Sequence, residues 1–346
     1  MEFLHRAAAL NPRGPQAWLE LSVAYGLHGD ADKAQAYLRR ASFLAPQLPS
    51  IQWVVGNFYL LQGNTDESFR HFKVTLNGGH RYDGILFRTA WKAAGDGEKI
   101  LRELIPPRLD TEFSYLEYLL SENKLSETMA VWERIASSPQ KFEPNRVKRF
   151  MDRLFTARML GEADQVWNDL RAKRLISSVY QPTAQNLIIN GNFEEDIIDV
   201  GYDWRIGRIE GVQAASDEGN FHSPGHAMRI RFAGKANLSY WHVYQYIRVE
   251  PKRKYRLQAF LKTDGITTDS GPRLRVVDVY DPEQLTKFSE SLTGSTRGWN
   301  QTILDFATVP TTELIMVSLA RVPSTKLDNL IAGTVWLDDV TLTPLP

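Results

Sequence analysis

The sequence predicts two kinds of structure in one chain, an all-helical repeat region followed by an antiparallel β-sandwich. Two observations predict this multidomain α and β fold. Apolar residues recur at helical spacing, with a 34-residue repeat, over roughly the first half of the chain, and they alternate with a period of two over the second half. The change of period falls at 176–185, a polar stretch that contains Pro182. We therefore expect a helical domain at 1–176, a linker at 177–185 and a sandwich at 186–346.

The helical region carries a repeat of two helices. Tyr25, Gly29, Ala34 and Leu38 are followed 34 residues later by Tyr59, Gly63, Ser68 and Phe72. This spacing resembles the tetratricopeptide repeat, in which large and small residues alternate so that two helices nest together. Further helix pairs with looser spacing are expected, with turns near Gly95, Asn123 and Gly161.

Residues before Pro15 match only the second helix of such a repeat, with Leu4, Ala7 and Pro12 at the corresponding positions. A lone helix cannot bury its apolar face, because each repeat is stabilised by its neighbours. We therefore expect the chain to begin in the middle of a repeat, with further repeats, and any export signal or anchor, upstream of it.

The second half predicts a series of short strands separated by turn signals such as Ser223-Pro224-Gly225 and Asp281-Pro282. Many short alternating strands of this kind favour an antiparallel sandwich. The strands are expected at 226–232, 244–249, 255–263, 273–280, 312–321 and 334–342.

Two motifs enclose this half, "NLIINGNFE" at 186–194 and "TVWLDDVTL" at 334–342. Together with "GWN" at 298–300 they resemble the carbohydrate-binding modules of the family 4/9 group, which have a galactose-binding-like jelly roll. The resemblance implies a structural calcium ion between the first and last strands. Its carboxylate ligands would be Glu194 and Asp338 or Asp339, a suitable donor set for calcium. The alternative is that these carboxylates only cap strand ends and pair with nearby basic residues.

The stretch "SYWHVYQYIRV" at 239–249 predicts a strand with four rings on one face, namely Tyr240, His242, Tyr244 and Tyr246. Aromatic faces stack on the apolar C–H faces of sugars. By the same alternation we expect Arg229, Arg231 and Arg256 on the outer face of neighbouring strands, where guanidinium groups would favour an acidic polysaccharide.

Two other interpretations of this face stay open: the helical domain folds back and covers it, or it is plain surface. Trp204 is a further candidate ligand residue, with a structural role as its alternative. In the helical region, Trp53, Asn57 and Leu60 are expected to line a groove that binds a protein partner.

Lys and Arg together number 41, as do Asp and Glu, so the net charge gives no reason to expect a nucleic-acid partner. No apolar run is long enough to span a membrane, and no catalytic motif is found. By analogy with the combined architecture, a tetratricopeptide-like region and a part that resembles carbohydrate-binding modules, we expect a non-catalytic scaffold, periplasmic or extracellular, that serves bacterial exopolysaccharide assembly or export. The alternatives are a pure protein–protein adaptor and an ancillary region of a larger enzyme or polymerase.

Overall fold

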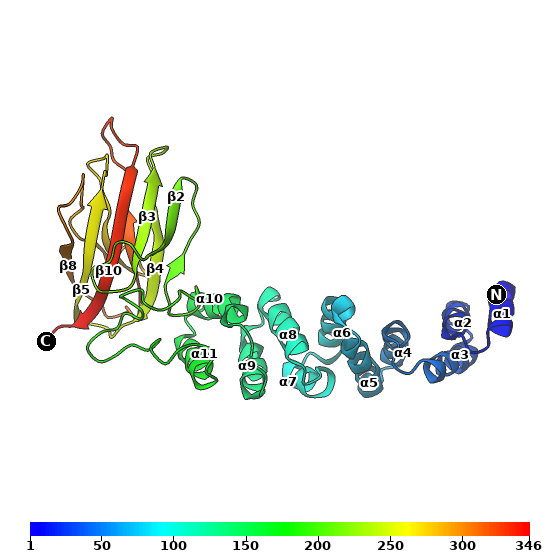
Figure 1. The fold of residues 1–346 in the computed structure, drawn as a ribbon. Coiled ribbons are helices and arrows are strands. Elements are labelled where there is room, and N and C mark those ends of the chain that lie inside the picture. Colours follow the sequence, from blue (N-terminus) through cyan, green and yellow to red (C-terminus); the bar gives the residue numbers. More distant parts are fainter. The chain divides into compact units, whose positions relative to one another are not determined.

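The computed structural model describes residues 1–346 and confirms the predicted fold class: eleven helices precede two antiparallel sheets (Figure 1). The chain forms two compact units, Met1–Gln140 and Lys141–Pro346. The division lies ahead of the predicted linker at 177–185, because the last helix pair belongs to the same unit as the sandwich. None of the helices combines the length and the apolar character that crossing a bilayer requires.

The helices form one single helix, α1, and then five successive pairs, as the repeat spacing predicts. Their bounds are α1 Glu2–Leu10, α2 Pro15–Leu27, α3 Ala31–Leu44, α4 Pro49–Leu61, α5 Thr65–Asn77, α6 Asp83–Ala94, α7 Gly97–Lys99 continued by a π-helical turn at Ile100–Leu104, α8 Leu109–Ser121, α9 Thr128–Ser137, α10 Lys148–Thr156 and α11 Leu160–Ala172. The last turn lies at 157–159, and Gly161 is inside α11 instead of in the turn expected there.

The repeated residues explain how each pair forms. Gly29 and Gly63 adopt positive φ angles of 80° and 75°, which end the first helix and favour glycine. The next residue, Asp30 or Asn64, then caps the second helix by accepting a hydrogen bond of 3.1 Å from a backbone N–H three residues on. Inside the pair, Gly56 gives the Phe72 ring the room to pack, since a Cβ at Gly56 would lie 2.4 Å from that ring.

The sandwich consists of two five-stranded sheets whose neighbouring strands are all antiparallel. Sheet A has the order β1-β4-β9-β6-β7, and sheet B has the order β2-β3-β10-β5-β8. The bounds are β1 Arg205–Ile206, β2 Val212–Asp217, β3 Ala227–Ala233, β4 Tyr240–Arg248, β5 Lys254–Asp264, β6 Arg273–Asp278, β7 Thr286–Phe288, β8 Asn300–Ala307, β9 Leu314–Arg321 and β10 Ala332–Pro344.

The core between the sheets is made by the inward residues of both. In β3 and β5 these follow the predicted alternation, with Met228, Ile230 and Phe232 and then Tyr255, Leu257, Ala259 and Leu261 buried. Gln245 of β4 is also fully buried, and its amide donates to the carbonyl of Ile189 (2.8 Å) and accepts from its N–H (3.0 Å). This pair of bonds holds the segment that enters the sandwich against β4.

The helix pair α10–α11 packs on the sandwich through an aromatic cluster. The Phe155 ring lies 5.1 Å from that of Tyr202 and 5.2 Å from that of Tyr246, and Trp167 contacts Tyr202 edge-on at 5.9 Å. Asp164 of α11 accepts hydrogen bonds from the Tyr202 hydroxyl and from Arg248 of β4. Helices therefore cover sheet A at Tyr246. This is one of the interpretations of the aromatic face that the sequence left open.

We expect Gly56→Ala to destabilise the first unit by about 1–3 kcal/mol, because the new methyl group overlaps the Phe72 ring. Gly84→Ala is the matched control: no atom lies within 4 Å of its Cβ position in α6, so it should be neutral or slightly stabilising. Urea denaturation followed by helical circular dichroism measures both. Equal free energies of unfolding for the two variants would contradict the packing role of Gly56.

We expect Phe155→Ala to cost about 3–5 kcal/mol, because Phe155 is 3% exposed and contacts both Tyr202 and Tyr246. Phe288→Ala removes the same atoms from a side chain that is 39% exposed, and should cost much less. Hydrogen exchange should show faster opening of α10 and α11 in the first variant only. Unchanged exchange in these helices would contradict their anchoring by Phe155.

Candidate functional site

The predicted aromatic row does not lie on one face of β4, because the strand contains a β-bulge. Tyr240 pairs with Arg321 and Val243 with Leu319, so Trp241 and His242 together oppose a single residue of β9. Tyr240 is consequently buried in the core at 1% exposure, and Trp241, expected inside, is 38% exposed. The prediction of Tyr240 as a surface residue was wrong for this reason. His242, Tyr244 and Tyr246 keep the outer face.

The three outer rings of β4 have different surroundings. His242 stacks on Trp241 with 4.9 Å between ring centres, and Tyr244 contacts Trp241 at 5.9 Å and Tyr246 edge-on at 5.3 Å. Tyr246 lies against Phe155 of α10, and burial raises its pKa. The row therefore divides into a part that helices cover, at Tyr246, and a half-buried part at His242 and Tyr244.

The predicted arginines lie on the other sheet. Arg229 and Arg231 belong to β3 and Arg256 to β5, both in sheet B, whereas β4 belongs to sheet A. Arg256 forms a two-pronged ion pair with Asp305 (2.7 and 2.8 Å), and Arg229 lies 3.3 Å from Asp217. The expectation that these arginines share a face with the tyrosines is thus wrong. Alternation along a strand fixes a face of that strand but not the sheet to which it belongs.

Trp204 also has a structural position. It is 1% exposed in the sandwich core, contacts Phe193 at a tilt with 5.1 Å between ring centres and donates its indole N–H to the carbonyl of Asn190 at 3.0 Å. Its ring and its N–H both have partners inside the protein. The structural alternative for Trp204 is the one that the structure supports.

The register of sheet A brings a different arginine next to Tyr244. Tyr244 of β4 and Arg275 of β6 both pair with Ser318 of β9, and Arg275 pairs on its other side with Phe288 of β7. Arg205 of β1 pairs with Tyr244 and completes the row. We call these five residues, Arg205, Tyr244, Ser318, Arg275 and Phe288, the cross-strand row. Since adjacent strands are about 4.8 Å apart, the row spans roughly 19 Å.

The polar groups of this row are incompletely used within the protein. Arg205 is bound to Asp152 (2.7 Å) and to the carbonyl of Asp199 (2.8 Å). The Nε of Arg275 and the hydroxyl of Ser318, by contrast, are buried and have no hydrogen-bond partner. Burial lowers the pKa of Arg275, and no carboxylate offsets this effect. The Tyr244 ring, the Ser318 hydroxyl and the Arg275 guanidinium group, which has no ion-pair partner, thus belong to neighbouring strands of one row.

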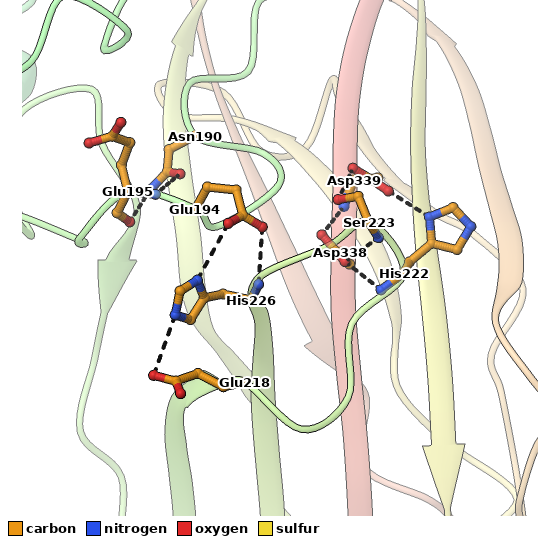
Figure 2. A network of polar contacts seen from close by, with 9 residues as sticks. All are labelled: Asn190, Glu194, Glu195, Glu218, His222, Ser223, His226, Asp338 and Asp339. Atoms are coloured by element: carbon orange, nitrogen blue, oxygen red, sulfur yellow. Dashed lines mark hydrogen bonds and ion pairs between the residues drawn. The ribbon is translucent and has the colours of Figure 1, made fainter.

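The residues predicted for calcium lie at the junction of the loop 218–226 with β10 (Figure 2). Glu194 accepts a hydrogen bond from the backbone N–H of His226 (3.0 Å), and Asp338 accepts from those of His222 (2.7 Å) and Ser223 (3.1 Å). Asp339 binds the ring of His222 (2.5 Å) and the hydroxyl of Ser223 (2.9 Å). The carboxylates therefore anchor this loop.

No three His, Asp or Glu side chains gather here, or elsewhere in the protein, in a way that could hold a metal ion. Glu194 and Asp338 bind different parts of the loop (Figure 2). Burial raises the pKa of Asp338 to about 6, an effect that its bonds to backbone N–H groups only partly offset. Calcium at this junction stays a prediction, and it would have to compete with the loop for these oxygens.

The groove residues of the helical region are partly buried. Trp53 stacks on Phe72 at 5.2 Å and on Tyr82 at 5.8 Å, and the Asn57 amide donates to the carbonyl of Trp53 at 2.7 Å. Leu60 lies one turn further along α4. Their use by a protein partner stays a prediction.

No family model matches the chain, and no curated protein matches it. Matched solved structures include both kinds of fold that the sequence resembles. A CBM4 structure is 20% identical, with a TM-score of 0.33 and coverage of 46% of this chain and 99% of its own. The type IV pilus biogenesis factor PilW is 17% identical, with a TM-score of 0.26 and coverage of 51% and 84%.

The enzymatically active domain of tailspike protein 4 from bacteriophage CBA120 is also matched, at 15% identity and a TM-score of 0.33. The match covers 46% of this chain but only 21% of the tailspike chain. Identities and scores at this level leave the function to be argued from the residues of this chain itself.

If calcium binds at Glu194 and Asp338, it needs Asp338 ionised and therefore competes with protonation of this carboxylate, whose pKa burial raises to about 6. We expect millimolar calcium to raise the melting temperature of the full chain at about pH 7.5, and to raise it much less at about pH 5, where Asp338 is protonated. Magnesium is the control ion. A melting temperature that is the same with calcium and with chelator at both pH values would remove the calcium site.

Without calcium, the contribution of Asp338 to stability changes with pH in the opposite direction to the calcium effect. Because the folded-state pKa of Asp338 lies above the ordinary value of 3.8, folding takes up a proton between these two pH values. The contribution of this group to stability therefore falls as the pH rises through about 6. Calcium-dependent stabilisation should appear in the range where the proton-dependent contribution is lost, so the two effects can be separated in one set of melting curves.

Proposed function

We propose that this chain is a non-catalytic scaffold that binds an acidic polysaccharide on the outer face of sheet A and a protein partner through its helical repeats. The observation that carries the proposal is the cross-strand row, in which Tyr244 and the unpaired Arg275 flank Ser318. A sugar ring stacks on an aromatic side chain, and its carboxylate binds a guanidinium group.

Only part of the cross-strand row is open to a ligand. Arg205 and Ser318 are 3% and 1% exposed, so a ligand would reach the row at Tyr244, Arg275 and Phe288. Phe288, at one end of the row, is 39% exposed, and Trp241, which contacts Tyr244, is 38% exposed. Arg273, in the neighbouring register of β6, adds a second guanidinium group whose Nε has no partner.

The helical half supports the scaffold part of the proposal. Stacked helix pairs expose a continuous surface that commonly binds a peptide or a partner helix. Combined with polysaccharide binding, this would suit bacterial exopolysaccharide assembly or export in the periplasm or outside the cell. That setting rests on the combination of the two folds and not on a single residue.

One observation favours the adaptor alternative. The Tyr246 end of sheet A is covered by α10, so this end serves contact within the protein and not a free ligand. A pure adaptor would use the remaining outer face in the same manner, for a protein. Binding experiments with polysaccharides distinguish the two functions.

We expect the full chain to bind an acidic polysaccharide such as polygalacturonate, and to bind neutral xylan more weakly. Tyr244→Ala should weaken binding about tenfold through loss of stacking. Arg275→Gln should weaken it by about tenfold or more through loss of a charge-assisted bond. Affinity electrophoresis or calorimetry gives the dissociation constants.

Arg256→Gln is the matched control, since it makes the same chemical change on sheet B, where Asp305 already pairs with the guanidinium group. It should leave binding unchanged. An equal loss in Arg256→Gln and Arg275→Gln would place the ligand away from the cross-strand row. A folded protein that binds no polysaccharide would favour the adaptor function.

A further inference from the structure

A second candidate site lies in a cleft between α11, the segment 181–189 and the end of β4. The cleft has a volume of about 420 Å³ and is lined by residues of the second compact unit alone. It is separate from the cross-strand row, although Tyr246 lines it and is the neighbour of Tyr244 in the outer face of β4. None of the sequence motifs predicts it.

The walls of the cleft are aromatic and held in place. Trp167 and Tyr202 meet edge-on, with ring planes 89° apart. The indole N–H of Trp167 donates to the carbonyl of Tyr180 (3.0 Å), and the hydroxyl of Tyr202 donates to Asp164 (2.5 Å). Trp167 and Tyr202 are only 3% and 7% exposed, so most of the apolar surface that a ligand can reach comes from Tyr246, Leu187 and Pro182. Leu187 and Ile189 extend the apolar lining.

The charges of the cleft are unequally paired. Arg248 is neutralised by Asp164 at 3.0 Å. Arg171, by contrast, directs its terminal nitrogens to two neutral amide oxygens, those of Asn168 and Gln181. Its Nε is buried and has no hydrogen-bond partner. A guanidinium group whose partners are all neutral favours an additional anionic oxygen.

The remaining polar groups suit hydroxyls. Asp164 accepts hydrogen bonds, and the amides of Asn168 and Gln181 both donate and accept. A ligand that fits has an apolar ring face for Tyr246 and Leu187, several hydroxyls and one negative charge. A cleft of this size holds one or two six-membered rings.

We propose that this cleft binds a single uronic acid residue, with its carboxylate on Arg171 and its ring against Tyr246 and Leu187. The inference deepens the proposed function, because a uronic acid is the unit of an acidic polysaccharide, but it uses different residues. The cleft would take a chain end or a side branch, while the cross-strand row would take the chain itself. Binding here would also connect α11, the segment 181–189 and β4.

The test is calorimetry of the full chain with free D-glucuronate, D-glucose and acetate. Glucuronate should bind at least about tenfold more tightly than glucose, which has the same ring without the charge, and than acetate, which has the charge without the ring. Arg171→Gln should remove this preference. Arg208→Gln, at an exposed position after β1, should keep it.

Equal binding of glucuronate and glucose, or of glucuronate and acetate, would overturn the inference, as would an equal loss in the Arg208→Gln variant. So would failure of glucuronate to bind to a protein that melts normally. Arg171→Lys keeps the positive charge but lacks the planar guanidinium group that binds a carboxylate through two hydrogen bonds. Glucuronate binding between that of the wild type and that of Arg171→Gln would therefore support the assigned contact. Melting curves of each variant show whether it folds.

The two proposals fail separately. Tyr244→Ala and Arg275→Gln should weaken polysaccharide binding and leave glucuronate binding intact, because neither residue lines the cleft. Arg171→Gln should weaken glucuronate binding and leave polysaccharide binding intact. Loss of glucuronate binding in the Arg275→Gln variant would assign the acidic sugar to the row and overturn the cleft as a site.

Discussion

The second unit depends on the need to cover one apolar end of sheet A. Tyr246, Met316 and Val277 lie side by side on the outer face of β4, β9 and β6, and leaving them in water would cost several kcal/mol. Phe155 of α10 packs on Tyr246, and the Tyr280 hydroxyl donates to the Phe155 carbonyl at 2.7 Å. A helix pair that belongs to the repeats by sequence is thereby part of the sandwich unit by packing.

This covering also limits the part of sheet A to which our proposals assign a ligand. Phe155 covers Tyr246 on the outer face. Tyr244, two residues earlier in β4, is left as the ring nearest to Arg275 in the strand register. At its edge this covering creates the cleft between α11 and β4, which neither the helices nor the sheet would form alone. Asp164 fixes this edge, because it holds both Tyr202 and Arg248. The same packing therefore closes one surface and shapes two others.

Local patterns predicted the helices and the inward residues of β3 and β5, because helix pairing and strand alternation depend on neighbouring residues. They could not predict the bulge at Trp241 and His242, which reverses the side on which Tyr240 and Trp241 lie. Nor could they show that Arg229 and Arg256 lie in the other sheet. Arg275 was within a predicted strand, but only the pairing of β6 with β9 places it beside Tyr244. Arg171 was inside a predicted helix, and only tertiary packing makes it part of a cleft.

The arginines to which we assign a ligand differ in their ion pairs from those of sheet B. On sheet B, Asp217 and Asp305 neutralise Arg229 and Arg256, and exposed pairs of this kind add little stability. On sheet A and in the cleft, Arg275 and Arg171 are partly buried, and each has an Nε without a partner. Holding a cation in that state costs free energy that folding alone does not recover. Our proposals assign an anionic ligand to these two arginines because neither has a carboxylate partner, whereas Arg229 and Arg256 do.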